Sequence, residues 1–401
     1  MRITLIARNY WPVVGGVESF LRHVAHGLAR DHDVEVLAQS IDGRPGTQMT
    51  GSLLPFPAFE PFCDGGVKVR QLKVSDVRRA AMVPLGLQVV PLARRYVYGQ
   101  LRRGLAAIYA RAVGPVIARE ARGTDVLHVW SGDLLAAGSV RAGAIAGLPT
   151  VVTPFVHPGG CNDDPASAAA YRRADRVIGL LETDAHVLRG LGVKESRVAV
   201  SGVCSPGMAR GGGRAIRKAF DVRGGLVVFL GVRRPYKGFD LLLQAAELLP
   251  DGEGAPTIAF LGPGPKIGPT ASGARVIDVG EVDDEGKAAW LEAADLLCLP
   301  SEFEIFPVSI LEAWSARTPV LVTDIPPLRE LVEGSGGGLT IERRADAIAV
   351  ALARCLADPD GLRRMGDAGW EEWSRRYTID AVVGWHEDEY MRLVGARNGT
   401  N

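Results

Sequence analysis

The feature that most constrains this chain is a regular alternation of short apolar runs with amphipathic stretches, which occurs in two successive series. Each run has the length and composition of a strand that is buried on both faces of a sheet. The stretches between the runs repeat their apolar residues at helical spacing. Because strands that alternate with helices form parallel sheets covered by helices, the pattern predicts an α/β fold with doubly wound sheets.

The first series contains six expected strands, at residues 3–7, 34–38, 126–129, 150–153, 176–179 and 198–200. The second contains five, at 226–230, 257–261, 275–279, 296–299 and 320–323, with helices expected at 240–249, 285–294 and 308–316 and further helices to the end. Between the two series, residues 205–225 are rich in Gly and Arg and lack apolar periodicity, which predicts an interdomain linker. Ligands of open α/β sheets bind at the carboxyl ends of the strands, so we look for functional residues there.

Charge and cysteine content exclude several classes of protein. The 46 basic and 46 acidic side chains balance, so no basic excess is available for binding nucleic acid. The five cysteines are scattered and form no CxxC pair, which excludes a disulfide framework or a zinc ribbon and indicates a reducing compartment. No segment has the pattern of a targeting sequence or a membrane span, and we expect a cytoplasmic protein.

Two glutamates near the fourth expected strand of the second series form the strongest candidate site. Glu304 falls in the loop after that strand, and Glu312 falls about a turn into the next helix. Pro307 stands where this helix begins, and proline suits such a position because its missing N–H would be unpaired there anyway. Carboxylates accept hydrogen bonds from hydroxyls, while the N–H groups of Phe306 and Val308 at a helix start attract anions. The arrangement predicts a ligand that carries hydroxyls and phosphate.

A short basic loop follows the first strand of the second series, in the sequence FLGVRRPYKGFD. Lys237, together with Arg233 or Arg234, can neutralise a diphosphate. Stabilising such a leaving group is much of the work of a group transfer, so this loop is a second candidate site.

The stretch 300–333, PSEFEIFPVSILEAWSARTPVLVTDIPPLRELVE, closely resembles the nucleotide-sugar signature of the family 4 glycosyltransferases, PSxxExFGxxxxEAxAxGxPVxxT. The resemblance implies that Glu304 holds the hydroxyls of the donor sugar and that Glu312 holds the ribose hydroxyls of the nucleotide. It also implies donor-binding positions in the loop between them, at Ile305, Phe306, Pro307 and Val308. Pro307 and Arg317 replace glycines of the signature, and these departures bear on the identity of the sugar.

Three further motifs resemble the same family. Residues 12–18 match PxxGGVE, which implies that Gly15 and Gly16 contact the donor phosphates. Residues 231–238 resemble GRxxxxKG, in which an arginine and a lysine grip those phosphates. Lys237 matches, but Val232 occupies the arginine position, so this role passes to Arg233, which we prefer slightly, or to Arg234. The sequence GEVD at 280–283 places Val282 in the loop beside the nucleotide base.

Two histidines and one acidic pair are further candidates for a functional role. His157, in TPFVHPGG, follows an expected strand end and can contact the sugar or polarise the acceptor, or else serve the fold; we group it with Lys237, Arg233 and Glu304 as catalytic. His128 lies within an apolar run and is expected in the core. Asp31 and Asp33 form a DxD pattern in an expected surface turn, and we expect neither a catalytic metal nor another cofactor.

The stretch from Arg78 to Arg122 holds nine arginines and a single acid. Its apolar residues recur at helical spacing, at Val97, Leu101, Leu105, Ile108 and Ala112. Such a basic amphipathic helix can lie on anionic lipid, which would place the protein at the inner face of the membrane. Alternatively, the helix covers the sheet and its arginines reach solvent.

These features predict a GT-B fold, in which two Rossmann-like domains face each other across a cleft. The resemblance implies that residues 1–205, with a returning helix at 378–401, form the acceptor side and that residues 206–377 bind the donor. The resemblance implies retaining transfer of a hexose-type sugar from a UDP- or GDP-sugar to a hydroxyl of a glycan, a lipid-linked acceptor or a small molecule. A nucleotide-sugar epimerase or phosphorylase, and a binding module without catalysis, are the alternatives.

Overall fold

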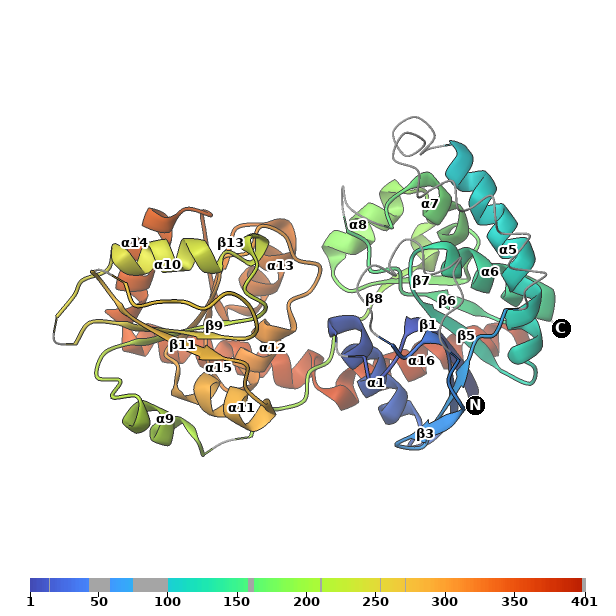
Figure 1. Ribbon diagram of the computed structural model, residues 1–401. Coiled ribbons are helices and arrows are strands. Elements are labelled where there is room, and N and C mark those ends of the chain that lie inside the picture. The colour runs from blue at the N-terminus through green and yellow to red at the C-terminus, as the bar shows by residue number, and fades with distance from the viewer. Residues whose placement is uncertain are drawn as a thin grey trace. The chain divides into compact units, whose positions relative to one another are not determined.

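The computed structural model describes residues 1–13, 15–42, 58–74, 100–157, 162–209, 211–252, 254–270 and 272–398. The chain divides into two compact units, each with a mainly parallel sheet and covering helices (Figure 1). Unit 1 comprises Met1–Gly202 and Val382–Asn401, and unit 2 comprises Val203–Ala381. The predicted α/β class is confirmed in both units.

Unit 1 is built on an eight-stranded sheet with the order β3-β4-β2-β1-β5-β6-β7-β8. Neighbouring strands are parallel, except that β3 runs antiparallel to β4. The direction of winding reverses at β1, so the carboxyl ends of β1 and β5 flank the position where such sheets bind ligands. The strands are β1 (Arg2–Asn9), β2 (Asp33–Ser40), β3 (Phe62–Asp64), β4 (Val67–Gln71), β5 (Val126–Trp130), β6 (Thr150–Val152), β7 (Arg176–Gly179) and β8 (Val198–Val200).

Side-chain caps and close packing explain why the helices of unit 1 begin and pack where they do. Asp133 accepts a hydrogen bond from the N–H of Leu135 at the start of α6, and Asp164 caps α7 in the same way. The C-terminal helix α16 lies beside α1, where a Cβ atom on Gly27 would come within 2.3 Å of Val383 (Figure 1). The helices of this unit are α1 (Gly16–Leu28), α5 (Gln100–Glu120), α6 (Leu134–Ala146), α7 (Pro165–Tyr171), α8 (Glu182–Gly190) and most of α16 (Ile379–Asn398).

Unit 2 has a six-stranded, fully parallel sheet with the order β11-β10-β9-β12-β13-β14. This is the 3-2-1-4-5-6 order of a Rossmann fold, and its switch point lies between the carboxyl ends of β9 and β12. The strands are β9 (Leu226–Leu230), β10 (Thr257–Leu261), β11 (Arg275–Gly280), β12 (Leu296–Leu299), β13 (Val320–Thr323) and β14 (Gly338–Ile341). The helices are α9 (Gly213–Ala219), α10 (Phe239–Glu247), α11 (Asp284–Ala293), α12 (Val308–Ser315), α13 (Pro326–Ser335), α14 (Ala345–Leu356) and α15 (Pro359–Arg376).

Two of the predictions about unit 2 are wrong. The expected linker at 205–225 contains α9, which packs on α11 and is fixed there because the N–H groups of Gly211 and Gly213 donate to Glu292 at 2.8 Å. The region after β13, expected to be entirely helical, contains β14, which pairs with β13. Both elements depend on contacts with distant parts of the chain, which local periodicity does not reveal.

The described part of the basic stretch, residues 100–122, forms α5 and the turn after it. The side chains of Tyr109, Val113 and Ile117 are fully buried in the core of unit 1, so this helix covers the sheet. Arg103, Arg111 and Arg119 are exposed. Residues 78–99, including Val97, lie outside the described residues, and contact of this stretch with lipid stays a prediction. Among the described residues, no helix is long and apolar enough to cross a membrane.

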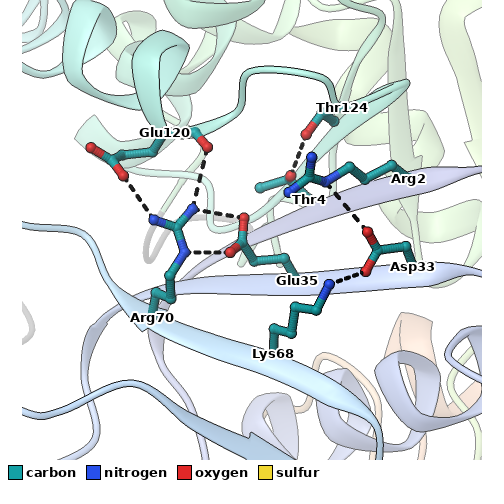
Figure 2. A network of polar contacts seen from close by, with 8 residues as sticks. All are labelled: Arg2, Thr4, Asp33, Glu35, Lys68, Arg70, Glu120 and Thr124. Atoms are coloured by element: carbon teal, nitrogen blue, oxygen red, sulfur yellow. Dashed lines mark hydrogen bonds and ion pairs between the residues drawn. The ribbon is translucent and has the colours of Figure 1, made fainter.

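A network of charged residues ties β1, β2, β4 and α5 together near the amino ends of β1 and β2 (Figure 2). Arg70 donates to both carboxylate oxygens of Glu35, at 2.9 Å for the Nη2–Oε2 bond, and to Glu120 Oε2 at 2.9 Å. Asp33 accepts from Lys68 at 2.7 Å. Because ligands bind such sheets at the opposite edge, this network serves the fold.

Two buried histidines join the returning helix α16 to the sheet of unit 1. His128, on β5, contacts the Tyr390 hydroxyl at 2.6 Å and the Thr153 hydroxyl at 2.8 Å, which confirms its expected place in the core. His386 packs beside it with 5.7 Å between the ring centroids, and its ring nitrogens have no hydrogen-bond partner among the described residues. Burial holds the pKa of His128 well below its usual value and lowers the pKa of His386 to about 3.

These lowered pKa values predict that acid destabilises unit 1. The unfolded chain binds a proton on each imidazole near pH 6.5, whereas the folded chain resists protonation until far lower pH. The free energy of unfolding therefore has its full value above about pH 6.5. At lower pH it decreases by about 1.4 kcal/mol per pH unit for each histidine. Urea unfolding between pH 7.5 and pH 5 measures this slope.

Variants separate these histidines from the carboxylates that also titrate in acid. His386→Phe removes one of the two buried imidazoles. The free energy of unfolding should then fall less steeply with decreasing pH, by up to about 1.4 kcal/mol per pH unit, which is the contribution of one proton. His186→Gln, which alters an exposed histidine of α8, should leave it unchanged. An identical pH dependence in all three proteins would contradict the assignment.

Candidate functional site

The candidate site of unit 2 is formed by the loops that follow β9 and β12, the two strands at the switch point. The first loop contains a short 3-10 turn, Pro235–Lys237, and leads into α10. The second runs from Pro300 to Pro307 and leads into α12. Both motifs that the sequence singled out therefore lie at the edge of the sheet where ligands of this fold bind.

Lys237 and Glu304, one from each loop, form a direct ion pair. The ammonium group of Lys237 donates to Glu304 Oε1 at 2.6 Å, and the hydroxyl of Ser301 donates to the same oxygen at 2.7 Å. Only 7% of the Glu304 side chain and 20% of the Lys237 side chain are exposed. The structure thus brings together two residues that are 67 positions apart in the sequence and that the motifs assigned to one site.

Glu312 is held by a residue that the sequence reasoning missed. Lys287, in α11, donates to Glu312 Oε1 at 2.6 Å and to Asp284 at 2.9 Å. Burial alone would lower the pKa of Lys287, but the charges of Glu312 and Asp284 and the hydrogen bonds to them outweigh burial and leave the pKa raised. The sequence does contain a signal for this role of Lys287. A lysine in the first turn of a helix lies near the positive end of the helix dipole, which is unfavourable, so a carboxylate partner is expected nearby.

The two candidate arginines occupy different environments. Arg233 is buried, and its guanidinium donates to Asp278 Oδ1 at 2.6 Å and to the Gly262 carbonyl at 2.8 and 3.1 Å. Burial opposes ionisation of Asp278, yet hydrogen bonds from Ile267 and Arg233 hold the pKa of Asp278 below its usual value. Arg234 is exposed. Which arginine grips a diphosphate stays a prediction, and this geometry now favours Arg234.

The other donor-site positions of unit 2 lie around the start of α12 and before α11. Val308 is the first residue of α12, with Pro307 directly before it, so the N–H of Val308 belongs to the first turn, which has no partner inside the helix. The ring of Phe306 is largely buried and packs edge-on against Tyr377. Ile305, in the same loop, and Val282, between β11 and α11, are half-buried.

In unit 1, the expected glycine loop lies at the carboxyl end of β1. Gly15 has an extended backbone with φ of −169°, and Gly16 begins α1. The carboxylate of Glu18 folds back to within 2.3 Å of where a Cβ atom on Gly15 would lie, whereas a Cβ atom on Gly16 would meet nothing within 4 Å. Gly16 therefore leaves the backbone open to a close-lying ligand.

His157 is half-buried in the loop after β6, and residues 158–160 of its motif lie outside the described residues. Its assignment as a catalytic residue stays a prediction. Asp31 and His32 of the DxD pattern lie in a turn, as expected, whereas Asp33 begins β2 and pairs with Lys68 and Arg2. In the described part of the chain, no group of three or more histidine, cysteine or acidic side chains is arranged to hold a metal ion.

The carboxyl edge of the unit 1 sheet also carries an ion pair that the sequence did not indicate. Arg8, at the end of β1, pairs with Asp133, which follows β5. Burial lowers the pKa of Arg8. Gln39, near the end of β2, is 4% exposed and donates to the Tyr109 hydroxyl at 3.0 Å. Polar groups therefore cluster at the switch point of this unit as well.

Each of the two units matches a known protein family. The family described as Glycosyltransferase Family 4 matches residues 14–201, and the one described as Glycosyl transferases group 1 matches residues 224–358.

Curated relatives show the same relationship. The D-inositol 3-phosphate glycosyltransferase of Kribbella flavida is 32% identical over 49% of this chain and 54% of the relative. The phosphatidyl-myo-inositol mannosyltransferase of Mycobacterium leprae is 32% identical over 40% of this chain and 44% of the relative. These matches span about half the length of the relatives. The MMP alpha-(1->4)-mannosyltransferase of Mycolicibacterium hassiacum is 25% identical over 92% of both chains.

Solved structures share the fold over almost the whole chain. HepE of Anabaena in complex with UDP has a TM-score of 0.69 and 17% identity, covering 97% of this chain and 99% of that one. The sucrose-phosphate synthase of Thermosynechococcus elongatus has a TM-score of 0.68 and 19% identity, covering 98% and 99%. With glycosyltransferase families matched in both units and this shared fold, the chain belongs to the family 4 glycosyltransferases and has the GT-B fold.

Proposed function

We propose that this chain is a retaining glycosyltransferase that moves a hexose-type sugar from a nucleotide diphosphate donor to a hydroxyl acceptor. The observation that carries the proposal is the Lys237–Glu304 pair at the switch point of unit 2. A cation beside a buried carboxylate suits a donor in which a charged diphosphate is joined to a polyhydroxylated sugar.

Each part of the donor has a group suited to it. Glu304 accepts hydrogen bonds from the sugar hydroxyls, and Glu312, which is paired with Lys287, accepts from the ribose hydroxyls. Lys237 and the exposed Arg234 neutralise the diphosphate. We expect UDP or GDP as the nucleotide, in keeping with the UDP and UDP-glucose complexes of HepE and with the mannosyltransferases among the relatives.

The reaction breaks the bond between the anomeric carbon and the diphosphate oxygen and forms a bond from that carbon to the acceptor oxygen on the same face of the sugar. The acceptor hydroxyl gives its proton to the departing phosphate oxygen. Lys237 stabilises the negative charge that develops there, which is the main electrostatic task of the protein. Glu304 orients the sugar and does not attack it, and no metal takes part in this proposal.

The acceptor that we propose is a hydroxyl compound. Two relatives are named for inositol phosphate or phosphatidylinositol substrates, which favours a polyol acceptor. In unit 1, His157 and the Arg8–Asp133 pair supply donors and acceptors of hydrogen bonds for such hydroxyls. Gly16 offers the close backbone approach that we assign to the donor phosphates.

Donor binding is tested by thermal unfolding in the presence of UDP, GDP, ADP and dTDP. A nucleotide at 100 times its Kd should stabilise the folded protein by about 2.7 kcal/mol, and we expect this for UDP or GDP. Glu312→Gln should reduce the shift measured against its own unliganded baseline, while Glu333→Gln, on the exposed end of α13, should keep it. Equal shifts in both variants, or none with any nucleotide, would refute this donor site.

Product analysis separates the proposal from its alternatives. In the absence of acceptor, a transferase releases nucleotide only slowly, through hydrolysis, whereas an epimerase converts the donor sugar. A binding module would show the thermal shift with no turnover at all.

A further inference from the structure

The two loops of the candidate site are joined by a pair of stacked aromatic rings. Tyr236 and Phe303 lie with their ring centroids 4.6 Å apart and their planes 5° from parallel. Phe303 is 42% exposed, so its ring is not explained by burial in the core. We call these two residues the aromatic clip.

The backbone of the loops meets at the same place. The N–H of Glu302 donates to the carbonyl of Tyr236 at 2.7 Å. Gly238 has a φ of +73°, and a Cβ atom there would lie 2.1 Å from the carbonyl oxygen of Pro300, so a side chain at 238 would push the loops apart. The two loops therefore contact each other through their backbones, at Glu302 with Tyr236 and at Gly238 with Pro300, as well as through the rings of the aromatic clip.

A third loop, which follows β14, also reaches the contact between the β9 and β12 loops through Arg343. Its guanidinium donates to the carbonyl of Pro235 at 3.0 Å and lies 3.8 Å from Glu302 Oε2. The guanidinium of Arg343 therefore links the two loops through contacts that do not involve the Lys237–Glu304 ion pair.

Each residue of the aromatic clip directly precedes a residue of the proposed chemistry. Tyr236 precedes Lys237, and Phe303 precedes Glu304. We propose that Tyr236 and Phe303 are positioning residues, which hold the β9 and β12 loops in the register that lets Lys237 meet Glu304. The kinetic consequence rests on the proposed function, whereas the effect on the ion pair does not.

The first experiment measures the ion pair without any substrate. Lysine acetylation, followed by mass spectrometry, reports the rate at which each ammonium group reacts. Lys287 is an internal control, because it is also bonded to a glutamate at 2.6 Å and is 19% exposed, against 20% for Lys237. In Phe303→Ala, we expect the reactivity of Lys237 to rise about tenfold relative to Lys287, since the loops open more often. Phe303→Trp, which keeps an aromatic face, should restore the original ratio.

The second experiment measures turnover, as nucleotide release from UDP-glucose and GDP-mannose. Phe303→Ala and Tyr236→Leu should lower kcat about 10-fold or more with a smaller change in KM, because misplacement of catalytic groups impairs the transition state more than binding. Tyr236→Phe should keep wild-type kcat. Val350→Ala, which removes another exposed apolar side chain of unit 2, is the control for surface truncation.

An unchanged Lys237 to Lys287 ratio in both Phe303→Ala and Tyr236→Leu would overturn the positioning role. If the wild-type protein turns over neither donor while the ratio rises as expected, the proposed function fails for these donors and the aromatic clip stands. If the ratio rises but kcat is unchanged in an active enzyme, the aromatic clip is structural only and the positioning role is overturned.

Discussion

Replacing Lys237 by alanine is expected to lower sugar transfer by about 100- to 1,000-fold, the range seen when a group that stabilises developing charge is removed. Glu304→Ala should have an effect of similar size, because the donor sugar loses its orientation and Lys237 loses its partner at 2.6 Å. Nucleotide release from UDP-glucose or GDP-mannose, measured with and without acceptor, gives kcat and KM for each variant.

The two variants should differ in how they bind the nucleotide alone. Glu304→Ala should bind UDP or GDP nearly as well as the wild type, since Glu304 is assigned to the sugar, whereas Lys237→Ala should bind more weakly. Lys218→Ala, on the exposed face of α9, is the matched control and should retain full activity. Near-normal turnover in both site variants would refute the assignment of this pair to the chemistry.

Arg70→Ala is expected to lower the free energy of unfolding of unit 1 by about 3 kcal/mol. The change leaves Glu35, only 5% exposed, without the cation that donates to both of its oxygens. The effect should fall at the lower end for such pairs because the Arg70 side chain is 34% exposed. Urea unfolding at pH 7.5 measures it.

Arg189 provides the matched comparison for this prediction. Like Arg70, it pairs with two glutamates, but Glu182 and Glu195 are 65% and 73% exposed. Water solvates these carboxylates when the arginine is removed, so Arg189→Ala should cost much less stability than Arg70→Ala. The double variant Arg70→Met with Glu35→Leu should recover most of the lost stability, because no unpaired charge then stays buried. Equal losses in Arg70→Ala and Arg189→Ala would contradict this account.

The sequence predicted most of the strands well because their signal is local. The strands β7, β8, β9, β10, β12 and β13 begin and end where the apolar runs do. Such short apolar runs between turn residues are typical of strands in a sheet that helices cover on both faces. The strands β3, β4 and β14, which lie at or next to the edges of their sheets, were missed, since they are short or polar and are specified by the strands that they pair with.

The place of the candidate site could be predicted from the sequence, because its two motifs directly follow the strands that flank the switch point of the unit 2 sheet. Nothing local revealed that the guanidinium of Arg233 pairs with Asp278, which lies 45 positions away. Arg317 illustrates the same limit, because it stands where the family signature has a glycine and has a positive φ of +62°. Its guanidinium lies 4.0 Å from the ring centroid of Trp370, a tertiary contact that motif matching does not reveal.

The division of unit 1 into two separate stretches of sequence affects the order in which the protein can fold during synthesis. Residues up to Gly202 leave the ribosome well before Val382 is made, with all of unit 2 in between. At about 5–20 residues per second, this interval is about 10 to 40 seconds. Until it ends, His128 lacks Tyr390, and the face of the sheet that α16 covers stays open. Unit 2 can therefore be complete while unit 1, whose larger part is made first, still lacks the helix that completes it.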